Sequence, residues 1–272
     1  MALIQMNFLS TALQRTVPVT VILPVDNTAI TDPKPVFPTL YLLHGLFGNH
    51  TDWTGNTRIQ QWAEERGLAV VMPSGDNSFY IDHQLPNQEY GKFIGRELVE
   101  MTRRAFPLSH NREDTFLAGL SMGGFGALRN GLKYADTFGY VAGFSSAVNI
   151  FEMPPDAPGR TLIREDLVFG DLEEARKSDK NPRVALLQAQ KAGLRIPRIY
   201  MSCGLQDPLV ECNRKLRDYF LDQGVCLTYT ESDGKHNWDF WNTEIRSILD
   251  WLPLPKPNAG LNSGNVSAEK NF

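Results

Sequence analysis

A serine flanked by glycines is the residue of this sequence with the clearest potential for chemistry. Gly119-Leu120-Ser121-Met122-Gly123 matches the pattern G-x-S-x-G, between an apolar stretch and a helix-forming stretch. In that context the serine sits on a sharp strand-to-helix turn with its hydroxyl exposed. The flanking glycines fit, because bulkier residues would collide at such a turn. The pattern therefore predicts a nucleophile, which at neutral pH needs a base to take its proton.

An acid and a base follow in the order that this pattern requires. Asp207 comes directly after the apolar stretch I-Y-M-S-C-G, and His236 lies in the segment S-D-G-K-H-N-W. An imidazole can accept the serine proton, and a carboxylate can hold that imidazole in the correct tautomer. We therefore expect Ser121 as nucleophile, His236 as base and Asp207 as acid. Asp233 is so near His236 in sequence that we expect it to shape the loop.

Two backbone N–H groups are needed to stabilise the oxyanion of a tetrahedral intermediate. One is predicted at Met122, the residue after the nucleophile, at the start of a helix. The other is predicted at Leu46, in the segment L-L-H-G-L-F-G-N that follows a buried strand. His44 in the same segment is expected to hold the loop by hydrogen bonding and to take no part in catalysis.

The sequence predicts neither a metal nor a cofactor. No two histidines are four residues apart, and the three cysteines form no C-x-x-C pair. Neither G-x-x-x-x-G-K-[ST] nor G-x-G-x-x-G occurs, so no nucleotide site is expected. The other histidines lie in polar, turn-like segments, and we expect them on the surface: His50, His83 and His110.

The composition excludes several classes of protein. The chain has 272 residues, 42% of them hydrophobic and 21% charged, and a formal net charge of −4. These are globular proportions, and the absence of a basic run argues against nucleic acid or anionic membrane partners. No apolar stretch approaches the roughly 20 residues that span a bilayer. The sequence has no recognisable export signal, and its odd number of cysteines favours a reducing compartment, so we expect a cytoplasmic protein. Homo-oligomerisation is left open.

Strands and helices alternate along the chain, which predicts an α/β fold with a mostly parallel central sheet and helices on both faces. Two antiparallel strands are expected before Pro24, with Pro18 marking a sheet edge. Later strands are expected at 39–43, 68–72, 115–118, 140–145, 198–203 and 226–231. Helices are expected at 58–65, 93–104, after Ser121, at 211–221 and before Trp251.

The predicted organisation is a single domain over residues 1–252 with a small cap insertion at about 148–182. That stretch breaks the alternation and is long for a plain loop. A cap there would narrow the pocket and favour small acyl groups. Residues 253–272 are poor in apolar residues, so a flexible tail is expected.

Four motifs together resemble a known family. They are H-G-L-F-G-N, P-S-G-D-N-S-F-Y, G-L-S-M-G-G-F-G-A-L and G-K-H-N-W-D-F-W, in this order along the chain. The sequence resembles the esterase D-like esterases, and most closely the bacterial tributyrin esterases. The resemblance implies an α/β-hydrolase fold and hydrolysis of short-chain acyl esters through an acyl-serine intermediate. It also implies the same roles for Ser121, Asp207, His236, Leu46 and Met122.

Related branches of that family offer alternative functions. They include S-formylglutathione hydrolases, feruloyl and carbohydrate acetyl esterases, and mycolyltransferases. Phe125 stands where S-formylglutathione hydrolases usually carry histidine, which argues against a glutathione thioester. Gly124 and the missing export signal argue against the mycolyltransferases. An acyltransferase, or a hydrolase-fold binding protein without catalysis, remains an alternative from another class.

Aromatic residues near the predicted catalytic loops are candidates for binding the ester substrate, a small molecule. The candidates are Phe47, Trp53, Tyr80, Phe125 and Trp238. Core packing is the alternative for each of them. Phe79 lies in the same neighbourhood, and Trp241 is expected to belong to the core.

Overall fold

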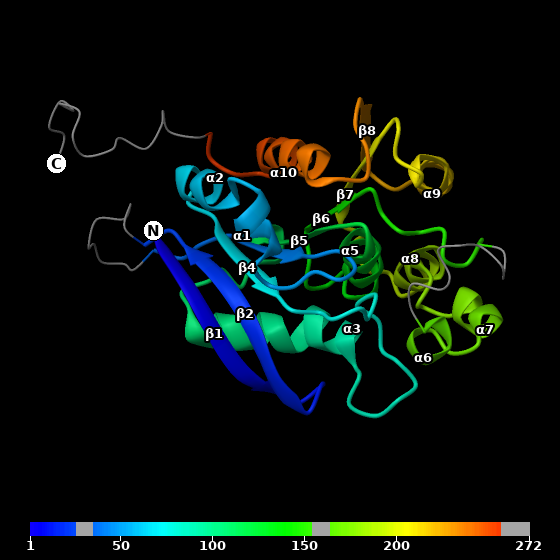
Figure 1. Ribbon diagram of the computed structural model, residues 1–272, viewed down its shortest axis with the longest axis horizontal. Coiled ribbons are helices and arrows are strands. Elements are labelled where there is room, and N and C mark those ends of the chain that lie inside the picture. The colour runs from blue at the N-terminus through cyan, green and yellow to red at the C-terminus, as the bar shows by residue number, and fades with distance from the viewer. Residues whose placement is uncertain (26–34, 154–163, 257–272) are drawn as a thin grey trace, which may run out of the picture.

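Eight strands form one sheet in the computed structural model, which describes residues 1–25, 35–153 and 164–256 (Figure 1). The strand order is β1-β2-β4-β3-β5-β6-β7-β8. The strands are β1 (Ala2–Ser10), β2 (Arg15–Leu23), β3 (Thr39–Leu43), β4 (Ala69–Pro73), β5 (Thr115–Leu120), β6 (Tyr140–Phe144), β7 (Arg198–Gly204) and β8 (Leu227–Ser232). β2 is antiparallel to both its neighbours, and the pairs from β4 to β8 are parallel.

Helices cover both faces of this sheet, which confirms the predicted α/β architecture. In β3, Leu40 and Leu42 pack with one apolar cluster, whereas Tyr41 and Leu43 pack with the other. A strand with two buried faces reads as a continuous apolar run. On the Leu40 face lie α1 (Asp52–Asn56), α2 (Ile59–Glu65) and α10 (Trp238–Trp251).

The opposite face carries the larger set of helices. They are α3 (Tyr90–Lys92), the π-helix η1 (Phe93–Glu97), α4 (Leu98–Ala105), α5 (Met122–Lys133), α6 (Glu165–Val168), α7 (Leu172–Lys177), α8 (Pro182–Lys191) and α9 (Val210–Asp222). A 3-10 turn, η2 (Arg112–Asp114), precedes β5. Among the described residues, no helix is both long and apolar enough to cross a membrane.

The prediction that Pro18 marks a sheet edge is wrong. Pro18 lies in β2, which pairs with β1 on one side and β4 on the other. Its carbonyl accepts the Ser74 N–H at 3.1 Å, so its own nitrogen also faces the β4 side. The register with β4 begins at Val19 opposite Pro73. An interior strand therefore tolerates this proline. The hydrogen bond that a proline nitrogen cannot donate to the neighbouring strand would lie just beyond the residues that β2 and β4 pair.

Residues 148–182 contain the short helices α6 and α7, before α8 completes the crossover from β6 to β7. The sequence analysis did not predict α8 or the single-turn α1. Residues 154–163 of the predicted cap and 257–272 of the predicted tail lie outside the described residues.

Candidate active site

Ser121 sits on the turn between β5 and α5 with a strained backbone. Its φ is 53° and its ψ is −116°, in a region that residues other than glycine rarely adopt. A Cβ atom at Gly123 would lie 2.5 Å from the His44 carbonyl oxygen, and one at Gly119 would lie 2.4 Å from the Gly123 carbonyl oxygen. The glycines therefore allow β3, β5 and α5 to approach closely enough to form this turn.

The structure brings Ser121, His236 and Asp207 into one hydrogen-bonded chain. Ser121 Oγ lies 3.0 Å from His236 Nε2, and His236 Nδ1 lies 2.8 Å from Asp207 Oδ2. The Asp207 side chain is fully buried, whereas 31% of the His236 side chain is exposed. With Nδ1–H donating to the carboxylate, Nε2 is left to accept the serine proton. This arrangement can activate the hydroxyl for attack on an acyl carbon.

Two loops at the carboxyl edge of the sheet hold Asp207 and His236 next to each other. Leu205 N–H donates to the Ser232 carbonyl at 2.9 Å, and Gln206 N–H donates to the Gly234 carbonyl at 3.0 Å. Gln206 Oε1 in turn accepts the Gly234 N–H at 2.8 Å. The loop after β7 and the loop after β8 are therefore joined, and Gln206 is a supporting residue that the sequence analysis missed.

The environment of Asp207 favours its charged form. Burial acts to raise the pKa of Asp207, but hydrogen bonds from His236 and the Leu209 N–H outweigh it, so the pKa lies below its ordinary value. The Ser145 hydroxyl also acts to lower this pKa. Trp241 Nε1 donates to Ser145 Oγ at 3.2 Å, and its ring meets the His236 ring edge-on at 4.9 Å. Trp241 therefore supports both the acid and the base.

His44 holds the loop that carries Leu46. Gly75 N–H donates to His44 Nε2 at 2.9 Å, so Nδ1 carries the proton and donates to the Gly45 carbonyl at 2.7 Å. Burial lowers the pKa of His44, which favours this neutral form. Leu46 lines the space above Ser121. Met122 opens α5, where N–H groups have no partner within the helix.

Ser121 and His236 lie where two cavities meet. The first, which we call the Leu209 cavity, has a volume of about 310 Å³. Its other lining residues are Leu46, Phe79, Ala147, Asn149, Ile150, Met153, Pro208 and Leu209. None of these side chains is charged. The Leu209 cavity therefore suits an apolar group.

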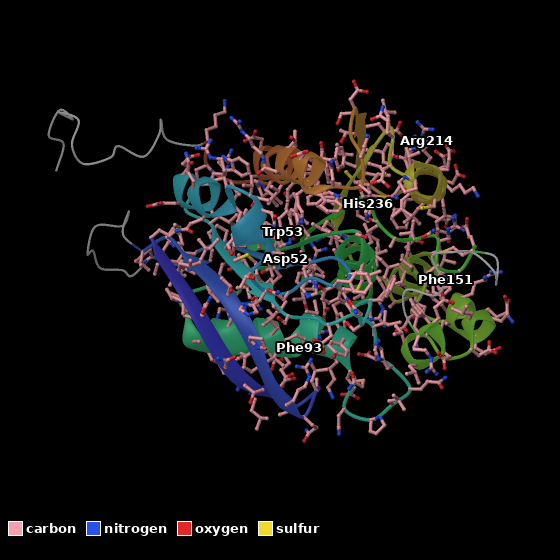
Figure 2. The ribbon with its side chains drawn as sticks, in the orientation of Figure 1. Asp52, Trp53, Phe93, Phe151, Arg214 and His236 are labelled. Carbon is pink, nitrogen blue, oxygen red and sulfur yellow. The ribbon has the colours of Figure 1, made fainter. Side chains whose placement is uncertain are left out.

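The second space, the Trp238 cavity, has a volume of about 280 Å³. Apart from Ser121 and His236, it is lined by Gly45, Leu46, Phe47, Asp52, Leu120, Trp238 and Trp241. Figure 2 shows Asp52 and Trp53 of α1 in the same part of the molecule as His236. The two cavities thus differ in character, since only the Trp238 cavity has a carboxylate in its wall.

Two of the five candidate binding residues, Phe47 and Trp238, line a cavity. Trp53 is 1% exposed and donates through Nε1 to the Leu43 carbonyl, and Tyr80 donates its hydroxyl to the His44 carbonyl. Phe125 is buried among the rings of other phenylalanines. Trp53, Tyr80 and Phe125 therefore lie behind the walls and line neither of the two cavities.

Most apolar residues of the Leu209 cavity were missed from the sequence. Ile150 and Met153 follow β6, and Pro208 and Leu209 follow β7. Asn213 ties these two segments together, because its amide nitrogen donates to the carbonyls of Ser146 and Leu209, both at 2.9 Å. The available signal was their position directly after strands that end at the same edge of the sheet.

The remaining histidines do not line either cavity. His110 is exposed, as expected, but His50 and His83 are half-buried. His50 Nδ1 lies 2.7 Å from Thr20 Oγ1, and His83 Nε2 lies 3.0 Å from the Ser78 carbonyl oxygen. Within the described residues, no group of three or more histidine, cysteine or acidic side chains is placed to hold a metal ion.

Comparisons with known proteins show similarity to esterases over most of the chain. The family model named Esterase, described as "Putative esterase", matches residues 10–252. An acetyl esterase from Caldicellulosiruptor saccharolyticus is 41% identical over 263 residues, spanning 93% of this chain and 98% of that protein.

Two solved structures from Staphylococcus aureus are also similar. One is a fluorophosphonate-binding serine hydrolase, FphF, with a TM-score of 0.83. The other is an S-formylglutathione hydrolase with a TM-score of 0.81. Both are 29% identical to this chain, and each match covers 92% of this chain and 98% of the other.

Proposed function

The chain belongs to the Esterase family and is a carboxylic ester hydrolase, and on that premise we propose that it cleaves short-chain acyl esters through an acyl-serine intermediate. Its fold is the α/β-hydrolase fold that the resemblance implied. The observation that carries the proposal is the hydrogen-bonded chain from Ser121 through His236 to Asp207, at the junction of two cavities.

The reaction begins when Ser121 Oγ attacks the carbonyl carbon of the ester and its proton passes to His236 Nε2. The N–H groups of Leu46 and Met122 stabilise the resulting oxyanion. The alcohol leaves with the proton held by His236. A water molecule then gives a proton to His236 Nε2 and attacks the acyl carbon. The bond between the acyl carbon and Ser121 Oγ breaks, Oγ takes the proton back from His236, and the acid is released. The Asp207 carboxylate accepts the hydrogen bond from His236 Nδ1–H throughout the reaction. The proposed mechanism uses no metal or cofactor.

The acyl group occupies the Leu209 cavity in this proposal. A cavity of about 310 Å³ whose described wall is mainly apolar favours an apolar chain, and its volume limits the length of that chain. Ile150 and Met153 of its wall belong to the segment after β6. We therefore propose that residues 148–182 act as a cap that restricts the acyl group.

Steady-state hydrolysis of p-nitrophenyl esters from acetate to laurate tests this function. We expect kcat/KM to be highest for acyl groups of two to four carbons and to fall with each longer ester. Replacing Ser121 by alanine should lower kcat by about 10⁴-fold or more, because the covalent route is lost. Full activity in the Ser121→Ala variant would refute the acyl-serine mechanism, and a preference for laurate would refute the short-chain assignment.

Other acyl acceptors and donors are examined in the same assay. S-formylglutathione is run beside p-nitrophenyl acetate, since one structural neighbour is an S-formylglutathione hydrolase. Added glycerol or glucose reveals acyl transfer if the yield of free acid falls below the yield of p-nitrophenol. We expect hydrolysis of the oxygen ester to dominate both comparisons.

A further inference from the structure

Asp52 places an unpaired carboxylate in the wall of the Trp238 cavity. It is the first residue of α1, and the segment from Gly45 to Asp52 brings it to the cavity. Within the described part of the chain, no lysine, arginine or histidine forms an ion pair with it, in contrast to Asp207 with His236. Apart from His236, it is the one ionisable side chain among the lining residues. Among its described lining residues the cavity therefore has one carboxylate and no lysine or arginine, which favours a positively charged group.

Aromatic rings form much of the remaining wall. Trp238 and Trp241 meet edge-to-face with ring centroids 5.3 Å apart, so their planes are perpendicular. Phe47 is 68% exposed and lies at the rim, where its N–H is held by Asn77 Oδ1 at 2.8 Å. Aromatic faces attract cations, and rings combined with a carboxylate form a recurring site for alkylammonium groups.

The contrast between the two cavities assigns them to the two halves of an ester. Among the described residues, no charged side chain lines the Leu209 cavity apart from His236 if it is protonated, so this cavity suits the acyl chain. The Trp238 cavity also reaches Ser121 and His236, so the alcohol oxygen could receive its proton from His236 there. Its carboxylate would be a poor neighbour for an acyl chain, because burying an unpaired charge against an apolar group is unfavourable.

We propose that the Trp238 cavity binds the alcohol part of the ester and selects alcohols that carry an ammonium group, with Asp52 as the residue that determines this specificity. The inference rests on the proposed function, because it assigns the second half of the same substrate. A neutral sugar fits the wall less well. A polyol needs several polar side chains to pair its hydroxyls. Besides Ser121 and His236, the described wall offers only the Asp52 carboxylate and the indole N–H groups of its two tryptophans, one of which is already bonded to Ser145.

A matched pair of acetate esters isolates the charge. Acetylcholine and 3,3-dimethylbutyl acetate have nearly the same shape, but only the first carries a positive charge. We expect the ratio of their kcat/KM values, cationic over neutral, to be about tenfold for the wild-type enzyme. Asp52→Asn should reduce this ratio about tenfold, and raising the ionic strength should reduce it in the wild type alone. The ratio cancels any general loss of activity in a variant.

Asp239→Asn is the control, because Asp239 is an exposed carboxylate next to Trp238 outside both cavities. It makes the same change in net charge and should leave the ratio as in the wild type. A wild-type ratio near one, or an equal fall of the ratio in both variants, would overturn the inference. So would faster cleavage of a 6-O-acetyl glucoside than of acetylcholine, which would assign the cavity to hydroxyl recognition.

Failure of the proposed function has a different signature. If Ser121→Ala still cleaves both acetate esters at the wild-type rate, the acyl-serine mechanism fails, whatever the ratio. If Ser121→Ala is inactive while the Asp52→Asn variant keeps the wild-type ratio, only the assignment of the Trp238 cavity fails.

Discussion

At the scale of single residues, the role of Asp207 follows from where its hydrogen bonds point. Its carboxylate accepts the His236 Nδ1–H and the Leu209 N–H, and these bonds overcome burial and keep its pKa low. Its charge is therefore present throughout the neutral range. In the proposed reaction, that charge holds the imidazole with Nε2 free and stabilises the imidazolium that forms.

Replacing Asp207 by asparagine should lower kcat by about 10⁴-fold while the fold is retained. The amide can donate to Nδ1, which would place the imidazole proton on Nε2, where it cannot accept from Ser121. Steady-state hydrolysis of p-nitrophenyl acetate measures the loss, and circular dichroism checks the fold. Asp233→Asn serves as control, since the one hydrogen bond that the Asp233 side chain accepts from the described residues is a long one, from Gln206 Nε2 at 3.4 Å. A similar loss in both variants would contradict the assignment of Asp207.

At the scale of elements, close approach of β3, β5 and α5 forms the serine turn, and glycine is required for it. A Cβ at Gly123 would meet backbone oxygens of Leu43 and His44, which cannot move aside as a flexible side chain can. We expect Gly123→Ala to destabilise the protein by about 1–3 kcal/mol and to reduce esterase activity at least tenfold. Urea unfolding and p-nitrophenyl acetate hydrolysis measure the two effects.

Gly55 is the matched control for that substitution. It lies inside α1, and a Cβ there would meet nothing within 4 Å. Gly55→Ala should therefore be neutral or should stabilise the protein by up to about 1 kcal/mol. If Gly123→Ala behaved in the same way, the close approach of backbone would have no part in forming the turn.

The segment after β6 should determine the length of the acyl group. Ile150 is 5% exposed and lines the Leu209 cavity. Shortening it by Ile150→Ala should shift the acyl optimum toward longer chains by one or two carbons, because space opens in the apolar wall. The p-nitrophenyl ester series measures this shift. An unchanged profile in a folded variant would mean that the acyl chain lies elsewhere.

At the scale of the whole molecule, the eight strands and most of the longer helices could be predicted from the sequence because their signals are local. Buried parallel strands read as apolar runs, such as 39–43 and 115–120, and a G-x-S-x-G turn carries its own context. Ser121, Asp207 and His236 could be proposed together from the sequence because each follows a strand that ends at one edge of the sheet.

The cavity walls could not be predicted from the same signals. Whether Trp53 or Trp238 faces substrate depends on packing between elements distant in sequence, and Trp53 lies beneath Trp238 with its ring centroid 5.2 Å away. Pro18 was misplaced for a related reason. A proline has no N–H, so it cannot donate one of the hydrogen bonds between neighbouring strands. Whether that missing bond lies inside the paired region depends on the register of β2 with β4, which the sequence does not show.

Stability of the whole fold should fall as the pH drops from about 7 to 5. Burial lowers the pKa of His44, His50 and His83 from the ordinary value of 6.5. The unfolded chain therefore binds more protons than the folded chain once the pH falls below about 6.5. The stabilisation from these three side chains is fully present above that pH and is lost progressively below it. Glu244 acts in the opposite sense, because burial raises its pKa.

The histidine contribution is isolated by comparing variants at two pH values. In urea unfolding at pH 7.5 and pH 5.0, the double variant His50→Gln, His83→Gln should lose less stability on acidification than the wild type, since glutamine takes up no proton. His110→Gln is the control, because His110 is exposed in the folded chain and keeps its contact with water. It should lose as much stability on acidification as the wild type. If the double variant lost as much stability as the wild type, carboxylates and not these histidines would cause the loss of stability at low pH.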